Sequence, residues 1–264
     1  MKDKLLYIIL LTLLGFSSNA GNKFQTPFSS WEVGIFGGGS YYLGEINQNH
    51  FSPINLAFGP FLRYNYDQRL NFRFGLNLGT ISGDDQNSNS SFNNDRNFTF
   101  TSKLIEVSTL MELNFFSFSA LDPNSHFISP YGYLGFAYAN HNPQSSYNGL
   151  NIAIADLETE GKSYSKNIFT IPMGVGIKFR FNRFGLGLDW GIRKTFTDYL
   201  DDVSTFYLAE SSSNSAQQNI ANTSNYDDVR NLKRGDQYNN DWYVFTGISL
   251  FVNLTAKDVC RKFK

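Results

Sequence analysis

The chain has 264 residues, of which 17% are aromatic and 22 are glycine, and it carries one cysteine and a formal net charge of −1. A charge near zero gives no electrostatic reason to expect nucleic acid as a partner, and a single cysteine excludes both an internal disulfide framework and a cysteine-rich zinc site. The mean hydropathy of −0.30 excludes a bundle of membrane helices, because each helix needs about 20 mostly apolar residues in a row.

Residues 1–20 have the three parts of a secretory signal peptide. A charged start precedes the apolar segment 5–16, and Ser18 and Ala20 supply small side chains at the −3 and −1 positions of a cleavage site. The alternative, a membrane anchor, is disfavoured because the apolar segment is too short to cross a hydrocarbon core of about 30 Å as a helix. We therefore predict cleavage after Ala20 and export of a mature chain that begins at Gly21.

Apolar and polar residues alternate with a period of two in eight later segments, which predicts eight strands with two different faces. In the clearest of them, Phe169 and Val175 share the apolar face, whereas Gly174 and Lys178 share the other. The segments are residues 31–44, 55–66, 70–83, 98–116, 128–140, 167–181, 184–196 and 242–254.

The connections between these segments are short at one end and long at the other, which is typical of an outer-membrane barrel with its long loops outside the cell. Aromatic residues suited to an interfacial girdle lie beside the short turns: Trp31, Tyr64, Tyr66, Phe115, Phe116, Phe179, Phe181 and Phe184. The short turns are 67–69 and 182–183, 117–126 is intermediate, 45–53 is modest, and the long polar loops are 84–97, 141–166 and 203–241.

A soluble β-barrel or sandwich is the alternative, with its apolar face inside and its charged face in water. The apolar face consists of large residues throughout, however, and the interior of eight strands has room for few of them. The sequence therefore predicts an all-β protein, an eight-stranded antiparallel transmembrane β-barrel of the outer membrane similar to OmpA and OmpW barrels. The barrel spans residues 31–254, between a periplasmic N-terminal segment, 21–30, and a periplasmic tail, 255–264.

The polar face of the predicted strands carries four acidic and five basic residues, which would point into the lumen. Buried charges are costly unless they are paired, so this nearly balanced set predicts a structural network that fills a narrow barrel. The alternative is a selectivity filter, but aqueous pores need about 16 strands or more. The residues are Glu32, Arg63, Arg73, Glu106, Glu112, Lys178, Arg180, Asp189 and Arg193.

Neither an enzyme nor a cofactor is expected from the titratable residues outside the strands. Of the three histidines, His126 follows a serine and lies near Asp122, but a turn of Asp, Pro, Asn and Ser is explained by turn chemistry. Cys260 in the tail is given no role. The aspartate pairs of the outer loops could gather Ca²⁺, although such pairs are usually solvated. They are Asp84 and Asp85, Asp198 with Asp201 and Asp202, and Asp227 with Asp228.

Three segments resemble the PorG-like proteins of Bacteroidota and together bracket nearly the whole mature chain. Residues 31–47 resemble the first strand of that family, 193–204 the end of its seventh strand, and 234–248 the entry into its eighth. The basic tail and the loop 207–225 have no clear counterpart. The residues that carry the resemblance are Asp198, Tyr199, Leu200, Asp201, Asp202, Asp241 and Trp242.

This resemblance implies a non-enzymatic outer-membrane component of the type IX secretion system, associated with a periplasmic ring of PorK-like and PorN-like proteins. Outer-membrane lipids would be the other partner. A ring must contact what faces the periplasm, so we predict contact by part of the turn 117–126 and by the tail, although both are equally explained as plain turn and terminus. The contact residues predicted are Leu121, Asp122, Pro123, Lys257, Arg261 and Lys262.

Two other functions stay open at this point. A small OmpA-like or OmpW-like barrel could bind a surface ligand through its long loops, or pass hydrophobic ligands along a narrow channel. A membrane-embedded hydrolase would need a nucleophile and a base within hydrogen-bond reach, and His126 and His141 are its candidates.

Overall fold

The computed structural model describes residues 28–88, 90–207, 220, 222–224, 229 and 232–255. The predicted signal peptide, its cleavage site and nearly all of the predicted tail, including Cys260, lie outside these residues. Among the residues that the structure describes, no helix is long and apolar enough to cross a membrane.

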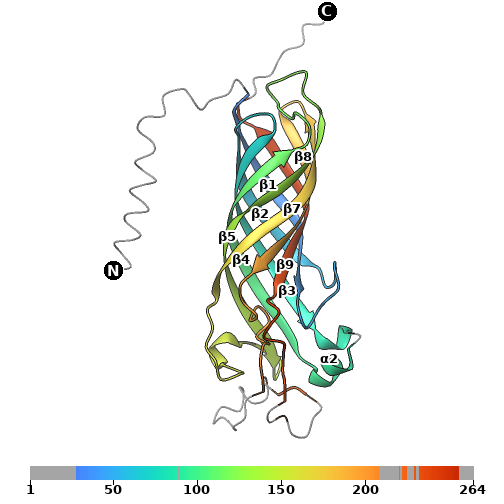
Figure 1. Cartoon of the computed structure of the whole chain (residues 1–264), viewed down its shortest axis with the longest axis vertical. Coiled ribbons are helices and arrows are strands. Elements are labelled where there is room, and N and C mark those ends of the chain that lie inside the picture. Colours follow the sequence, from blue (N-terminus) through green and yellow to red (C-terminus); the bar gives the residue numbers. More distant parts are fainter. Residues whose placement is uncertain are drawn as a thin grey trace, which may run out of the picture.

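Eight long antiparallel strands close into a barrel (Figure 1), which confirms the predicted fold class. The strand order is β4-β3-β2-β1-β9-β8-β7-β5, and pairing between β4 and β5 closes the ring. Closure pairs the backbone groups of every strand on both sides, as a lipid environment requires. The strands are β1 (Ser30–Leu43), β2 (Asn55–Asn65), β3 (Leu70–Asp84), β4 (Thr99–Asn114), β5 (Ile128–Tyr147), β7 (Asn167–Phe181), β8 (Phe184–Thr195) and β9 (Trp242–Asn253).

The fifth strand is longer than its alternation predicted. It continues past Asn140 to Tyr147 and turns into the short strand β6 (Leu150–Ala153), so the prediction of a loop throughout 141–166 is wrong. Asn148 and Gly149 form the turn with φ of 51° and 78°, the left-handed pair that an Asn-Gly hairpin favours. Short helices also occupy the outer loops: η1 (Asp85–Asn87), α2 (Ser91–Arg96) and η2 (Ala155–Leu157).

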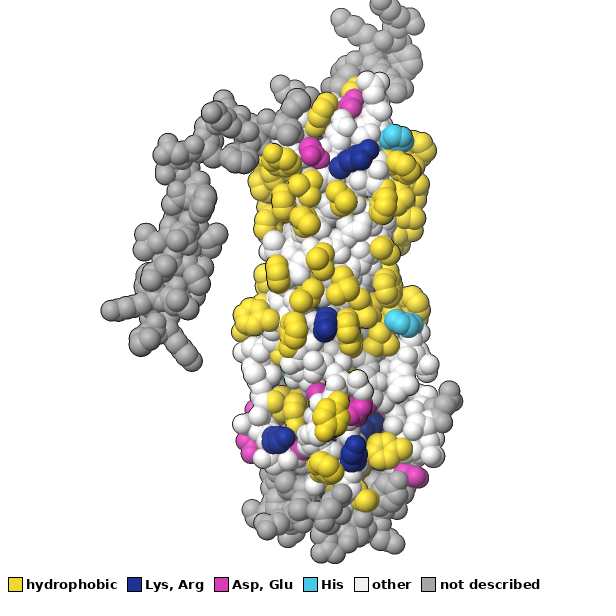
Figure 2. Space-filling view, viewed as in Figure 1, with side chains coloured by type: hydrophobic (Ala, Val, Ile, Leu, Met, Phe, Trp, Pro, Cys, Tyr) yellow, Lys and Arg dark blue, Asp and Glu magenta, His cyan; other side chains and the backbone are white. Residues whose placement is uncertain are grey.

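The outward face of the wall is apolar and the inward face is polar, the reverse of a soluble barrel. Along β4, exposed and buried residues alternate without interruption. Its exposed positions include Ile105, Val107 and Met111, and Phe136 on β5 is 76% exposed. Figure 2 shows apolar side chains covering the wall from the short-turn end to beyond its middle. Such a continuous exposed belt is stable only against lipid, so the barrel is a transmembrane one of the outer-membrane type.

Both ends of the described chain lie beside each other at the short-turn end (Figure 1). The Leu254 N–H donates to the Trp31 carbonyl at 2.8 Å, and the Trp31 N–H donates to Thr255 Oγ1 at 3.2 Å. Because long loops of such barrels face the outside, this end is periplasmic. There the turn 117–126 folds inward, and Phe118 packs against Phe61 and Phe251.

The interior of the barrel has two layers. Charged residues fill the periplasmic half, and a cluster of buried aromatic and aliphatic residues fills the extracellular half. The members of that apolar cluster contributed by the strands include Phe36, Tyr42, Ile81, Phe100, Leu104, Tyr243 and Phe245. Above it, the loop segments 44–54, 85–88, 90–98, 154–166, 196–207 and 232–241 form what we call the cap; the last two belong to the same loop, between β8 and β9.

Candidate functional site

The charged layer of the lumen is organised around Glu112, which is fully buried on β4. Its Oε2 lies 2.9 Å from Arg63 Nε and 2.6 Å from Lys178 Nζ, and its Oε1 lies 2.9 Å from Arg73 Nε. Three cations from three other strands therefore share one carboxylate. The pairing offsets a desolvation cost of several kcal/mol for each buried ion.

Further carboxylates complete the pairing of these cations. Glu32 accepts from Arg63 at 2.8 Å, and Asp189 accepts from Arg73 at 2.9 Å. In a further buried pair, Arg193 Nε lies 3.2 Å from Glu106 Oε2. Eight of the nine residues expected in the lumen thus form buried ion pairs. The ninth, Arg180, lies apart and donates to the carbonyl and the hydroxyl of Ser125 in the periplasmic turn.

The remaining free space within the charged layer is small. A cavity of about 30 Å³ lies between Arg73, Asp189 and Arg193, which is about the volume of one water molecule. Aromatic rings contact the guanidinium groups from the sides, with Arg73 at 5.1 Å from the Tyr133 ring and Arg193 at 4.6 Å from the Phe245 ring. The lumen in this state is filled by side chains.

The cap is held together by a second buried arginine system, centred on Arg234. Its Nη1 donates to Glu160 Oε1 at 3.0 Å and to the Asp202 carbonyl, and its Nη2 lies 3.5 Å from Asp202 Oδ2. The guanidinium stacks at 4.8 Å on the Phe98 ring. Glu160 in turn accepts the backbone N–H of Thr205 at 2.8 Å. Arg234 therefore ties two parts of the loop between β8 and β9 to the loop before β7, and it also contacts Phe98 in the loop between β3 and β4.

Arg96 at the end of α2 adds hydrogen bonds between the loop that joins β3 to β4 and this system. Its Nε and Nη2 each donate to Asp85 at 2.7 Å, a bidentate pair, and its Nη1 donates to the Arg234 carbonyl at 2.7 Å. Both side chains of the pair are almost fully buried. The cap is thus a cross-linked unit and not a set of independent loops.

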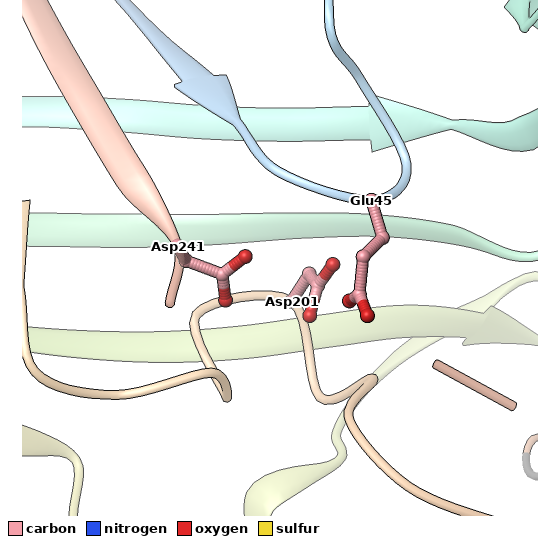
Figure 3. Close-up of side chains that lie close together, drawn as sticks. All are labelled: Glu45, Asp201 and Asp241. Atoms are coloured by element: carbon pink, nitrogen blue, oxygen red, sulfur yellow. The ribbon is translucent and has the colours of Figure 1, made fainter. Parts of the chain in front are cut away.

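Beside the arginines, the carboxyl groups of Glu45, Asp201 and Asp241 come together from distant segments (Figure 3). Tyr42 Oη lies 2.6 Å from Asp201 Oδ2 and 2.6 Å from Asp241 Oδ1, and it accepts the Glu45 N–H at 3.1 Å. One ligand oxygen from each of Glu45, Asp201 and Asp241 lies within 4.8 Å of the others. This is the carboxyl cluster of the cap.

The two short contacts of Tyr42 Oη with aspartate oxygens require either a second proton, in addition to the hydroxyl proton of Tyr42, or a bound cation. A hydroxyl has one proton, so Tyr42 can donate to only one of its two aspartates. The second short contact needs a proton on the aspartate itself. Alternatively, Glu45, Asp201 and Asp241 could hold a hard cation such as Ca²⁺, which takes six to eight oxygen ligands and would need more than this cluster supplies.

Burial and mutual repulsion favour protons in this cluster. Burial, and then the charge of Asp201, raise the pKa of Glu45 to about 9. Burial raises the pKa of Asp201 to about 7, that of Asp202 to about 6, and that of Asp198 to about 8 against the opposing effect of the Ser204 hydroxyl. The pKa of Asp241 is also raised, by burial and by the neighbouring carboxylates.

We expect the cap to open more easily as the pH rises from about 5 to about 9. The pKa values of Glu45, Asp198 and Asp201 in the folded cap lie above the value of about 4 that carboxyl groups have when exposed. The folded cap therefore binds more protons, so their contribution to stability is complete below about pH 4 and is lost as the pH rises through about 7 to 9. Hydrogen-exchange protection factors of the Leu200 and Val203 amides, which donate to Asp241 and Asp201, report this opening.

Amides of β4 in the barrel wall serve as the internal control for that measurement, because among the described residues they form no hydrogen bond with Glu45, Asp198 or Asp201. Protection of Leu200 and Val203 that stays constant or increases with pH would contradict the prediction. Added Ca²⁺ that restores protection at about pH 9 would identify a cation as the alternative occupant of the cluster.

The structure brings together most of the residues that carried the sequence resemblance. Asp198, Leu200, Asp201, Asp202 and Asp241 are buried in the cap, and Leu200 joins its apolar base. Tyr199 stacks on Tyr164 at 4.7 Å, and Trp242 faces outward at the start of β9. The aspartates of the outer loops were expected to be solvated, and those described here at positions 85, 198, 201 and 202 are buried instead. Asp227 and Asp228 lie outside the described residues.

Sequence reasoning missed the partners of these aspartates: Tyr42, Glu45, Arg96, Glu160 and Arg234. Arg234 and Tyr42 lie within segments that resemble PorG-like proteins. That resemblance was the only feature of the sequence that pointed to these two residues. Arg96 and Glu160 come from polar loops without any periodicity. Their roles depend on contacts such as Arg234 with Glu160, which are 74 residues apart in the chain.

The periplasmic turn places the predicted contact residues at its outer edge. Pro123 is exposed, and Leu121 and Asp122 are half-buried. Asp122 accepts from Gln68 Nε2 at 2.6 Å. His126 Nδ1 lies 3.2 Å from Ser117 Oγ, and Asp122 is engaged with Gln68 and not with this histidine. Lys257, Arg261 and Lys262 lie outside the described residues.

Closed strand pairing, an exposed apolar belt and a charged interior define a small transmembrane β-barrel of the outer-membrane type. The chain belongs to the family described as a domain of unknown function, DUF6089, whose model matches residues 4–261. A comparison with curated proteins finds no match.

Solved structures of small barrels are similar to this chain at low scores. Ail, the attachment invasion locus protein of Yersinia pestis, has 12% identity, covering 85% of this chain and 96% of that chain, with a TM-score of 0.38. Neisserial surface protein A has 12% identity, covering 85% and 97%, with a TM-score of 0.39. The N-terminal β-barrel domain of Pseudomonas aeruginosa OprF has 10% identity, covering 86% and 97%, with a TM-score of 0.38.

Proposed function

We propose that the protein is a non-enzymatic barrel component of the type IX secretion system that associates with a periplasmic ring of PorK-like and PorN-like proteins. One observation carries the proposal: the three segments that resemble PorG-like proteins meet in the carboxyl cluster. Tyr42 and Glu45 come from the first segment, Asp201 from the second and Asp241 from the third. The resemblance thus follows a shared three-dimensional unit, as expected for a common architecture.

The filled lumen supports a role in assembly. Buried ion pairs around Glu112 and the apolar cluster above them occupy the path through the barrel. A barrel of this kind acts through its two ends, the cap outside and the turns facing the periplasm. A structural attachment point needs no more than that.

The first test is co-purification of the ring with the barrel from outer membranes in mild detergent. An affinity tag inserted between Asn148 and Gly149 would lie at an exposed hairpin, where a Cβ added to Gly149 meets no atom within 4 Å. We expect mass spectrometry to find a periplasmic ring lipoprotein and its partner in the eluate. A barrel that elutes alone, still heat-modifiable, would contradict the proposed function.

The same tagged protein tests the predicted periplasmic contact. Replacing Leu121 and Pro123 by alanine, together with Lys257, Arg261 and Lys262 of the tail, should reduce recovery of the ring. The matched control is Leu150→Ala, which truncates an apolar side chain that is 69% exposed at the opposite end of the barrel. Equal recovery with both variants would exclude the turn and the tail as the contact.

A further inference from the structure

A cleft lies on the outside of the barrel wall, where the extracellular ends of three strands meet. Leu43 on β1 is paired with Trp242 on β9, and Trp242 is paired with Lys194 on β8. All three side chains belong to the outward faces of their strands, since the residues next to them on β8 and β9, Arg193 and Tyr243, point into the lumen. This row forms the floor of the cleft.

The cap forms the other side of the cleft and gives it depth. The loop after β1 contributes Gln48 and His50, α2 contributes Phe92, and the loop before β9 contributes Lys233 and Tyr238. The cleft is open to solvent and has a volume of about 930 Å³, which is in the range of sites for small organic ligands.

Two ammonium groups in the cleft are free to bind an anion. Lys194 and Lys233 are exposed, and neither forms an ion pair with a carboxylate among the described residues; Lys194 lies 5.8 Å from the Trp242 ring. Glu45, a cap residue that also lines the cleft, accepts the Asp236 N–H through its Oε1. Asp236 accepts from Tyr238 N–H and Asn239 Nδ2, within its own loop.

The position of the cleft indicates that its ligand is an amphiphile. Ile192 in the floor lies on the same outward face of β8 as Trp190 and Leu188, which belong to the lipid-facing belt. Leu43 and Trp242 are the terminal residues of their strands on this side, so the cleft lies where the belt gives way to the cap. A ligand here has its apolar part in the outer leaflet and its polar part against the cap.

We propose that this cleft binds the phosphorylated sugar headgroup of an outer-leaflet glycolipid. Lys194 and Lys233 pair with phosphate oxygens. The rings of Trp242 and Tyr238 pack on the sugar faces, and the amides of Gln48 and Asn239 bond to sugar hydroxyls. The acyl chains continue along Ile192 and the belt below it.

Native mass spectrometry of the full mature chain in detergent, titrated with bisphosphorylated lipid A, tests this proposal. The variant Lys194→Ala with Lys233→Ala should bind the lipid at least about tenfold more weakly than wild type. The matched control, Lys103→Ala with Lys162→Ala, removes two exposed lysines elsewhere on the outer half and should bind like wild type. If the double variant is not heat-modifiable, Lys194→Gln and Lys233→Gln are tested singly.

Three further probes distinguish the headgroup from simpler anions. Dephosphorylated lipid A and phosphatidylglycerol should each bind at least about tenfold more weakly than bisphosphorylated lipid A, and inorganic phosphate should not compete. If phosphatidylglycerol binds as tightly as lipid A, the site recognises only the negative charge of a lipid. If inorganic phosphate competes, the site binds small anions and not the headgroup. Either result overturns the proposal. Unchanged affinity in the Lys194 and Lys233 variant overturns it as well.

Discussion

Glu112→Gln is expected to destabilise the barrel by about 3–5 kcal/mol, the usual cost of removing one partner from a buried ion pair. The substitution keeps the shape of the side chain and removes the charge that Arg63, Arg73 and Lys178 share. Glu32 and Asp189 still neutralise the arginines, so the largest penalty falls on Lys178, whose other hydrogen bond is to Asn114 Oδ1 at 3.1 Å. Equilibrium unfolding in urea, with the barrel in lipid vesicles and tryptophan fluorescence as the signal, measures this loss.

The matched control is Asp156→Asn, which breaks an ion pair of similar length at the surface. Asp156 Oδ2 lies 2.7 Å from Lys166 Nζ, but the two side chains are 70% and 31% exposed. Such pairs contribute about 0–1 kcal/mol. The double variant Glu112→Gln with Lys178→Met removes both charges and should recover part of the stability. Equal losses for Glu112→Gln and Asp156→Asn would mean that the lumen network is not a source of stability.

Arg234→Ala is expected to open the cap and to leave the barrel wall intact. The substitution leaves the buried carboxylates of Glu160 and Asp202 without their cation, at a local cost of about 3–5 kcal/mol. Glu160 also holds the Ser204 and Thr205 amides, at 3.0 and 2.8 Å. We therefore expect the protection of these two amides from hydrogen exchange to fall by about two to three orders of magnitude.

Lys233→Ala is the control for Arg234→Ala, because Lys233 is the preceding residue and its side chain is exposed. It should leave the protection of Ser204 and Thr205 unchanged. Heat-modifiable migration should be the same for both variants, which separates opening of the cap from unfolding of the wall. Similar exchange in both variants would show that Arg234 does not hold the cap closed.

The barrel wall could be predicted from the sequence because each strand residue has only two possible directions. Side chains of a strand alternate between its two faces. Once Phe169 and Ile171 are assigned to the lipid-facing side, the alternation therefore places Lys178 in the lumen, even though its ion-pair partner is unknown. The predicted segment 167–181 coincides with β7. The end of β5 was missed because the extension to Tyr147 rises beyond the membrane, where water on the outer face removes the apolar half of the pattern.

The cap could not be predicted in the same way, because the side chains of its loops do not alternate between two faces. Asp201 and Asp202 carry the same sequence signal as any solvated aspartate pair. Their burial depends on Tyr42, which lies 159 residues from Asp201 and is brought close when β1 pairs with β9, and on Arg234, which lies 32 residues from Asp202 in the same loop. The general rule for polar loops failed here because hydrogen bonds and charges from other loops replaced water.

The pairing of β1 with β9 also determines which step closes the barrel during folding. These are the first and the last strands of the described chain, and they share a register from Glu32 with Asn253 to Leu43 with Trp242. Until β9 pairs with both β1 and β8, the wall is an open sheet in which β1 and β8 have unpaired edges. Contacts between residues so far apart in the chain make folding slow, and the last step is the pairing of β9 with β1, the seam of the barrel. Any factor that inserts this protein into the membrane must shield that seam.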